Sequence, residues 1–206
     1  MSLNPAPAVL LVPGLGGSGA EHWQTIWADQ FANCHKVELG SWDEPQRRTW
    51  VDNLNLAIRD VDGPVVLVAH SLGCLAAAWW LQSHGRGPVI AAMLVAPPEV
   101  DFFPRDDRLT RFAPTPRDPL PVPSRLIASR NDPWIGFHTA EALARSWGST
   151  LVDAGAVGHI NAEAELGLWG FGREQLALLM RDAAHAMTEP SACPQAPAEH
   201  AALAGS

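Results

Sequence analysis

Short apolar runs alternate with segments of helical pattern along most of the chain. The predicted helices cover residues 20–32, 47–60, 72–84, 136–147 and 163–184. The apolar runs predict six strands: Val9–Val12, Lys36–Leu39, Val65–Ala69, Val89–Val95, Ser124–Ala128 and Thr150–Asp153. Because strands and helices alternate, we expect parallel β-α-β winding, with right-handed crossovers that place helices on both faces of one sheet. Strand Val65–Ala69 is apolar along its length, which indicates a central strand buried on both faces.

Two regions break this alternation. Between Ala96 and Pro123 the chain holds eight prolines, which argues against a long helix there. This proline-rich segment, which runs from Pro97 to Pro123, is too short for a separate cap domain, so we expect an irregular lid or rim loop. From about Thr188 onward the residues are mostly Ala, Pro, Ser, Glu and Gly, which predicts a disordered tail. The expected organisation is one domain over residues 1–187, followed by a tail over residues 188–206.

Composition narrows the classes of partner. The chain has 206 residues, 47% of them hydrophobic, and a net charge of −8, which argues against nucleic acid or an anionic membrane as a partner. It contains no apolar run near the roughly 20 residues of a membrane span, and Met1 to Ala8 has no signal-peptide pattern. Three distant cysteines fit neither a disulfide framework nor a zinc site, so we expect a cytoplasmic protein with no metal and no cofactor.

The strand Val65–Ala69 stops at a serine flanked by small residues. The run Ala69-His70-Ser71-Leu72-Gly73 leads directly into the apolar helical segment 72–84. This pattern is typical of a nucleophile elbow, a tight strand-to-helix turn that exposes one hydroxyl for attack on a carbonyl. The usual motif is Gly-x-Ser-x-Gly, and Ala69 stands at its first position. The alternative is that Ser71 only caps the helix that follows.

A nucleophilic serine needs a base and an acid that orients the base. Asp132 follows the predicted strand Ser124–Ala128, and His159 ends a glycine-bearing loop after Thr150–Asp153. Loops after successive strands in the order Ser, Asp, His are the arrangement in which such triads occur. We therefore assign Ser71 as nucleophile, His159 as base and Asp132 as acid.

Other histidines and aspartates are weaker candidates. His138 and His84 fall within or at the end of predicted helices, and His185 and His200 lie at or in the tail. His70 occupies the variable position of the elbow, where we expect its ring to point away from Ser71. Asp101 follows the strand Val89–Val95, a position that some hydrolases use for the acid, and Asp153 ends a strand rather than a loop.

The developing negative charge on the attacked carbonyl needs backbone N–H donors. One predicted donor is the N–H of Leu72, immediately after the nucleophile. The second is the N–H of Leu15, in the glycine-rich loop Pro13-Gly14-Leu15-Gly16-Gly17 after the first strand. A phosphate-binding loop fits poorly here, because no Gly-Lys-Ser/Thr follows and the spacing matches no dinucleotide fingerprint.

With these residues the chain resembles the α/β-hydrolase superfamily, and within it the small serine hydrolases grouped with retinoblastoma-binding protein nine and their bacterial YdeN-like relatives. The residues that carry the resemblance lie between positions 9 and 180: Pro13–Ser18 with His22-Trp23-Gln24, Trp42-Asp43-Glu44-Pro45, Ala69–Gly73, Ser129–Pro133 and Gly158–Glu163. Ala164-Glu165 and Trp169-Gly170 depart from the Ser-Gly and Trp-Pro expected of the family. The resemblance implies a three-layer α/β fold without a cap domain, a Ser71–Asp132–His159 triad and hydrolysis of esters or amides.

The predicted function is therefore hydrolysis of a small ester or amide substrate through an acyl-enzyme intermediate. Side chains that could line the substrate pocket are Trp134, Phe102, Phe103 and His22, although core packing or, for His22, helix capping explains them equally well. The alternative is a hydrolase-fold protein-binding module with vestigial activity. The oligomeric state, the physiological substrate and the choice between water and another acyl acceptor stay open.

Overall fold

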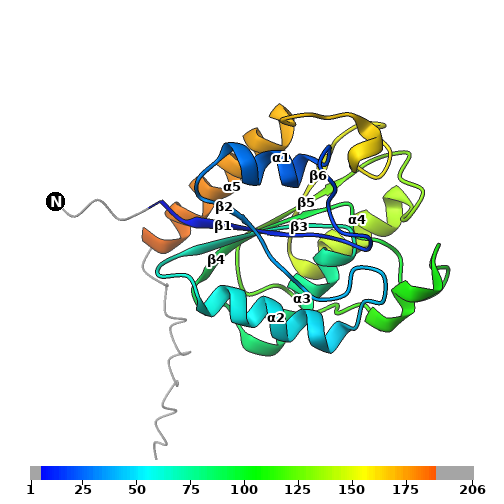
Figure 1. Cartoon of the computed structure of the whole chain (residues 1–206), viewed down its shortest axis with the longest axis horizontal. Helices are drawn as coiled ribbons and strands as arrows, with labels where there is room; N and C mark the ends of the chain where they lie inside the picture. The colour runs from blue at the N-terminus through cyan, green and yellow to red at the C-terminus, as the bar shows by residue number, and fades with distance from the viewer. Residues whose placement is uncertain (1–5, 189–206) are drawn as a thin grey trace, which may run out of the picture.

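Six parallel strands form one open sheet in the order β2-β1-β3-β4-β5-β6 (Figure 1). The computed structural model describes residues 6–188. The strands are β1 Ala8–Val12, β2 Cys34–Lys36, β3 Val65–His70, β4 Val89–Val95, β5 Ser124–Ala128 and β6 Thr150–Asp153. The helices are α1 Trp23–Gln30, α2 Arg47–Arg59, α3 Leu72–His84, α4 Phe137–Trp147 and α5 Gly170–Thr188, with short 3-10 helices η1 Asp107–Phe112 and η2 Ala162–Ala164. The predicted α/β-hydrolase architecture is confirmed.

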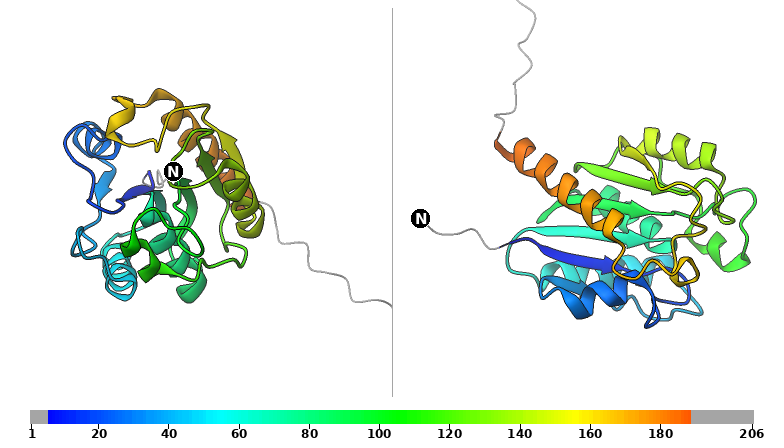
Figure 2. Two further views of the ribbon diagram at one scale, coloured as in Figure 1. Left: turned by 90° about the vertical axis from the view of Figure 1, so that its right-hand side faces the viewer. Right: turned by 90° about the horizontal axis from the view of Figure 1, so that it is seen from above.

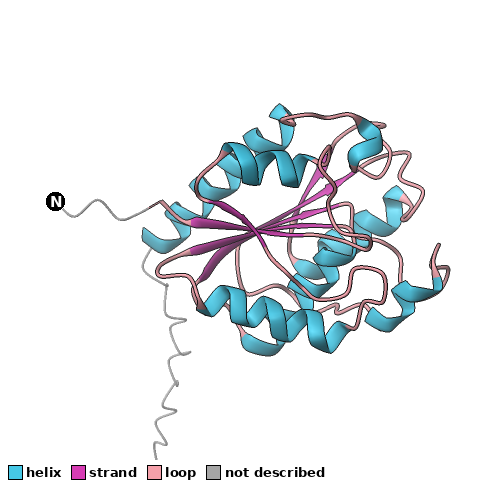
Figure 3. Cartoon of the chain, viewed as in Figure 1, coloured by secondary structure: helices cyan, strands magenta, loops and turns pink. Residues whose placement is uncertain are grey.

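Side chains alternate between the two faces of the sheet because successive strand residues point in opposite directions. In β3, Val65 and Leu67 pack into the core cluster that contains residues of α2, α3 and α4. Val66 and Val68 pack into the opposite cluster, with residues of α1 and α5. Helices therefore cover both faces (Figure 3), and α5 lies across the strands when the sheet is seen from above (Figure 2). All six residues of β3 are buried, as a central strand requires.

Several element boundaries differ from the sequence prediction: α1 is shorter than residues 20–32, and the second strand and the last helix are shifted. The second strand pairs with β1 through Cys34–Lys36, whereas Lys36–Leu39 was expected. Val37 and Leu39 are buried all the same, because they pack in the cluster with Trp50 of α2. The last helix begins at Gly170 rather than near residue 163.

The proline-rich segment is irregular, as predicted. It contains the 3-10 helix η1, whose Leu109 and Phe112 are buried in the cluster beneath α3. Within residues 6–188 no cap domain is present. Of the predicted tail, only Thr188, which ends α5, is described, and the remainder lies outside the described residues. In the part of the chain that the structure describes, no helix has the length and apolar character needed to cross a membrane.

The winding direction reverses between β1 and β3. The chain leaves β1 toward α1 on one face, and it leaves β3 toward α3 on the other face. In open α/β sheets a crevice forms at such a reversal, beyond the carboxyl ends of the strands, and ligands bind there. Ser71 and the glycine-rich loop 13–17 both lie at this edge.

Candidate active site

Ser71 lies in a strained turn between β3 and α3. Its backbone has φ 52° and ψ −128°, a region that residues other than glycine seldom adopt. The N–H of Ser71 donates to the carbonyl of Val95 in β4 at 2.9 Å, which ties the turn to the sheet. Its side chain makes no capping hydrogen bond to α3. The hydroxyl is thus held at the helix N-terminus without being used as a cap.

Two glycines allow the backbone to close around this turn. A Cβ on Gly73 would overlap the carbonyl oxygens of Val12 and Pro13. A Cβ on Gly14 would lie 2.7 Å from the Cβ of Ser71. The loop after β1 therefore lies directly against Ser71, and the sequence tolerates this approach only because both positions lack a side chain. Ala69, buried between Val12 and Leu94, leaves the turn undisturbed.

A chain of short hydrogen bonds joins Ser71, His159 and Asp132. His159 Nε2 lies 2.8 Å from Ser71 Oγ, and His159 Nδ1 lies 2.9 Å from Oδ1 and 3.0 Å from Oδ2 of Asp132. Because a carboxylate can only accept, Nδ1 carries the proton and Nε2 is left to accept from the serine hydroxyl. The Asp132 side chain is fully buried, and its Oδ1 also accepts the N–H of Trp134 at 2.9 Å.

Helix α1 holds the loop that carries His159. The indole N–H of Trp23 donates to the carbonyl of Ile160 at 2.8 Å, and that of Trp27 donates to the carbonyl of Leu168 at 2.9 Å. The rings of both tryptophans pack near Trp169, at 4.7 and 6.1 Å between ring centroids. The helix after β1 thereby fixes the position of a loop that follows the last strand.

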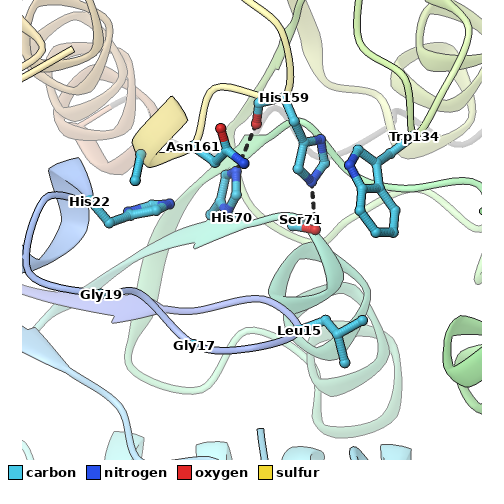
Figure 4. A pocket seen from close by; sticks show the side chains of 10 residues that line it. Leu15, Gly17, Gly19, His22, His70, Ser71, Trp134, His159 and Asn161 are labelled. Atoms are coloured by element: carbon cyan, nitrogen blue, oxygen red, sulfur yellow. Dashed lines mark hydrogen bonds between the residues drawn. The ribbon is translucent and has the colours of Figure 1, made fainter. Parts of the chain in front are cut away.

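A cavity of about 200 Å³ opens at Ser71 and His159 (Figure 4). It is lined by Leu15, Gly17, Gly19, His22, His70, Ser71, Trp134, His159, Asn161 and Ala162. Its volume is below the roughly 300–1,000 Å³ typical of pockets for drug-sized ligands. None of these lining side chains is an Asp, Glu, Lys or Arg, so a small uncharged group fits the cavity best.

Two buried histidines in this cavity are neutral. Burial, with smaller effects from Lys36 and His159, lowers the pKa of His22 to about 4. Burial also holds the pKa of His70 well below its usual range, with His22 and His159 adding to the effect. His70 Nε2 donates to the carbonyl of His159 at 2.9 Å, since a carbonyl cannot donate. These rings therefore shape the site as neutral dipoles at pH 7.

Comparisons with known proteins fit this geometry. A protein-family model described as serine hydrolase matches residues 9–178. The chain belongs to the serine hydrolase family. A protein described as a YdeN-like hydrolase from Pectobacterium atrosepticum is 36% identical to it, with 85% of this chain and 91% of that chain covered and a TM-score of 0.77. The resemblance to YdeN-like hydrolases noted in the sequence is thus confirmed.

More distant structures share the fold alone. The ydeN gene product from B. subtilis is 18% identical over 85% of this chain and 100% of its own, with a TM-score of 0.68. Est1E from Butyrivibrio proteoclasticus, in a complex with ferulic acid, is 12% identical over 85% of this chain and 92% of its own, with a TM-score of 0.57. A search of curated proteins found no match.

The rival acids of this serine hydrolase are engaged elsewhere. Asp101 accepts the N–H of Thr115 at 2.8 Å and pairs with Arg117 at 3.0 Å. Asp153 pairs with Arg130, and this contact lowers the pKa of its carboxyl. Neither residue lines the cavity at Ser71.

The predicted pocket residues divide into two pairs. Trp134 and His22 line the cavity, and the Trp134 ring stacks on that of His159 at 5.2 Å between centroids. Phe102 and Phe103 are not among the lining residues and are 74% and 89% exposed. Their loop follows β4, and Glu99 Oε1 accepts the N–H groups of Asp101 and Phe102 there.

The predicted backbone donors are placed on either side of Ser71. Leu72 is the first residue of α3, and Leu15 lies in the loop that Gly14 brings against the serine. Among residues 6–188, neither N–H has a backbone acceptor, whereas the neighbouring Gly16 N–H donates to Trp42. Leu15 lines the cavity, and Leu72 directly follows Ser71, which lines it as well.

Sequence reasoning missed three polar residues at the site. His70 lines the cavity with Ser71, and its ring donates to the carbonyl of His159. Asn161 also lines it. Gln24 is fully buried, accepts the hydroxyl of Ser18, and donates to the carbonyls of Val12 and Val68, the latter at 3.0 Å. In the sequence, Gln24 is marked only by its position directly after His22 and Trp23, which does not predict that it is buried.

Proposed function

We propose that this serine hydrolase cleaves a small ester or amide through an acyl-enzyme intermediate, with Ser71 as nucleophile, His159 as general base and Asp132 as the acid that orients the base. The observation that supports it is the continuous hydrogen-bond chain from Ser71 Oγ through His159 to the buried Asp132 carboxylate. Such a chain activates a hydroxyl because the base lies within reach of its proton.

In the first step, Ser71 Oγ attacks the substrate carbonyl while His159 Nε2 takes the hydroxyl proton. A bond forms between Oγ and the carbonyl carbon, and the carbonyl oxygen becomes an oxyanion that the N–H groups of Leu15 and Leu72 stabilise. The protonated His159 then donates to the leaving alcohol or amine as its bond to carbon breaks. Water attacks the acyl-enzyme by the same route in reverse and regenerates Ser71.

A small substrate is favoured because the cavity is small and lined without ionised side chains of Asp, Glu, Lys or Arg. Short acyl esters and simple amides satisfy both conditions. We also propose the cytosol as the compartment, since Cys34 and Cys74 are free thiols buried in the fold.

The test uses Ser71→Ala and the matched control Ser83→Ala. Ser83 lies on α3 and does not line the cavity; its hydroxyl donates to the carbonyl of Trp79 and contacts the ring of His84, both in the same helix. We expect Ser71→Ala to lose nearly all hydrolysis of p-nitrophenyl acetate and all labelling by a fluorophosphonate probe, while Ser83→Ala keeps both. Undiminished turnover in Ser71→Ala contradicts the proposal. A wild-type protein that the probe does not label would favour a binding module with vestigial activity.

A further inference from the structure

The two ring nitrogens of His22 have different environments. Nδ1 accepts the backbone N–H of Gln24 at 3.1 Å and so caps helix α1. Nε2 is buried and has no hydrogen-bond partner within the described part of the chain. The side chain is 4% exposed and lines the cavity that contains Ser71 and His159 (Figure 4). Helix capping therefore accounts for Nδ1 but not for the burial of Nε2 without a partner.

The unpaired nitrogen is a donor. An Nδ1 that accepts from a backbone N–H has no proton, so in the neutral ring the proton is on Nε2. The lowered pKa of His22 keeps the ring neutral at pH 7. A buried N–H without an acceptor is destabilising, and because such groups are rare in native proteins, each calls for an explanation such as a functional role or a bound water or ion.

We propose that the Nε2–H of His22 binds a neutral acceptor oxygen of the substrate, a carbonyl or ether oxygen separate from the one under attack, and so determines specificity. The inference rests on the proposed ester or amide hydrolysis. The ring of His70 lies between those of His22 and His159: its centroid is 4.7 Å from that of His22 and 5.1 Å from that of His159. The acceptor therefore lies several bonds away from the scissile carbonyl.

The surroundings favour a neutral oxygen over a carboxylate. Lys36 is the cation whose charge lowers the pKa of His22, and its ammonium donates to the carbonyl of Ser18 at 2.9 Å and the hydroxyl of Thr25 at 3.2 Å. Asn161 offers a second dipole: its Oδ1 accepts the N–H of Glu163, and within residues 6–188 its Nδ2 donates to no other group. A carboxylate would enter this cavity without a charged partner and lose its hydration.

Two substitutions separate recognition from capping. In His22→Asn, the side-chain oxygen takes the place of Nδ1, so the cap is kept and the pocket donor is lost. In His22→Gln, the amide nitrogen takes the place of Nε2, so the donor is kept and the cap is lost. A residue that only caps the helix would show the larger effect in His22→Gln.

The activity assay compares paired esters in which an oxygen replaces a carbon. The pairs are p-nitrophenyl methoxyacetate with butyrate, p-nitrophenyl 4-oxopentanoate with 4-methylpentanoate, and 2-methoxyethyl acetate with butyl acetate. For each pair, the ratio of kcat/KM between the two esters is measured in wild type and variants, which cancels differences in intrinsic reactivity. We expect His22→Asn to lower the ratio roughly 5- to 150-fold for at least one pair, and His22→Gln to retain most of it at a lower Tm.

A binding measurement separates this inference from the proposed catalysis. The measurement uses Ser71→Ala, so that the esters bind without being hydrolysed. The ¹⁵N-labelled ring of His22 is followed by NMR during titration with methyl methoxyacetate, methyl 4-oxopentanoate and 2-methoxyethyl acetate, and with the hydrocarbon analogue of each. We expect the Nε2–H resonance to move with at least one oxygen-bearing ester and not with its analogue. Unchanged ratios in His22→Asn for all three pairs, or an Nε2–H resonance insensitive to every ester, overturns the role of His22 even if Ser71 is the nucleophile.

Discussion

The neutral histidines of the site make the fold sensitive to mild acid. The unfolded chain takes up a proton on each imidazole below about pH 6.5, whereas folded His22 does so only near pH 4. Between these values the unfolded state binds more protons, so the free energy of unfolding falls as the pH falls. His70, whose pKa is also lowered by burial, acts in the same direction.

The size of the effect follows from the pKa of His22. A displacement from 6.5 to about 4, at about 1.4 kcal/mol per pH unit, corresponds to about 3 kcal/mol of stability at pH 7. This is a sizeable part of the roughly 5–15 kcal/mol that stabilises a typical domain. The carboxyl of Asp106, whose pKa the neighbouring Arg108 lowers to about 2, contributes only in a more acidic range.

Urea unfolding monitored by tryptophan fluorescence at several pH values between 7 and 4.5 gives the free energy of unfolding at each pH. The slope of that free energy against pH is the quantity to compare between variants. We expect His22→Asn, which keeps the helix cap and cannot titrate, to reduce the slope by about 1 kcal/mol per pH unit in the middle of this range. His138→Asn is the matched control, because the His138 side chain is 98% exposed. A wild-type slope in His22→Asn would refute the assignment of the acid sensitivity to this ring.

Three further substitutions test the site. Gly73→Ala places a Cβ against the carbonyl oxygens of Val12 and Pro13 and should lower the unfolding free energy by about 2 kcal/mol or more, whereas Gly19→Ala, with open space around it, should not; equal stability of the two contradicts the steric reasoning. Asp132→Asn should reduce kcat roughly 10³- to 10⁴-fold with the Tm little changed, because the His159 tautomer is lost, and a reduction below about threefold would exclude Asp132 as the acid. Trp134→Ala removes the ring stacked on His159 and should lower kcat roughly 3- to 10-fold; an unchanged kcat would show that the stacking does not position the base.

The fold was predictable where local sequence determines it. The buried strand β3 and the small residues around Ser71 specify the elbow within a few positions, because a tight turn excludes larger side chains. The order in which Asp132 and His159 follow their strands then locates them at the same edge of the sheet. Their mutual hydrogen bonds follow from that topology rather than from any local pattern.

The rest depends on tertiary contacts that a pattern of hydrophobic residues does not encode. Residues before α5 were expected to be helical, yet Glu165 and Trp169 have φ of 48° and 41°, and Trp169 turns inward onto the α1 tryptophans. Val37 and Leu39 are buried because they pack in the cluster that contains Trp50 of α2. The paired residues of β2 end at Lys36, and only the N–H of Val37 still donates to β1, at the carbonyl of Leu11. The free nitrogen of His22 becomes visible only when its other nitrogen is seen to cap α1.

The tryptophans of α1 have a consequence for how the molecule folds. Their hydrogen bonds to the loop of His159 join residues 137 and 141 positions apart in the chain. Closing such long loops costs entropy before any contact compensates for it, so contacts of this kind form late. The elbow at Ser71, by comparison, joins adjacent elements. We therefore expect the turn at Ser71 to form before His159 reaches it during refolding, so that the site is completed only when the two ends of the domain meet.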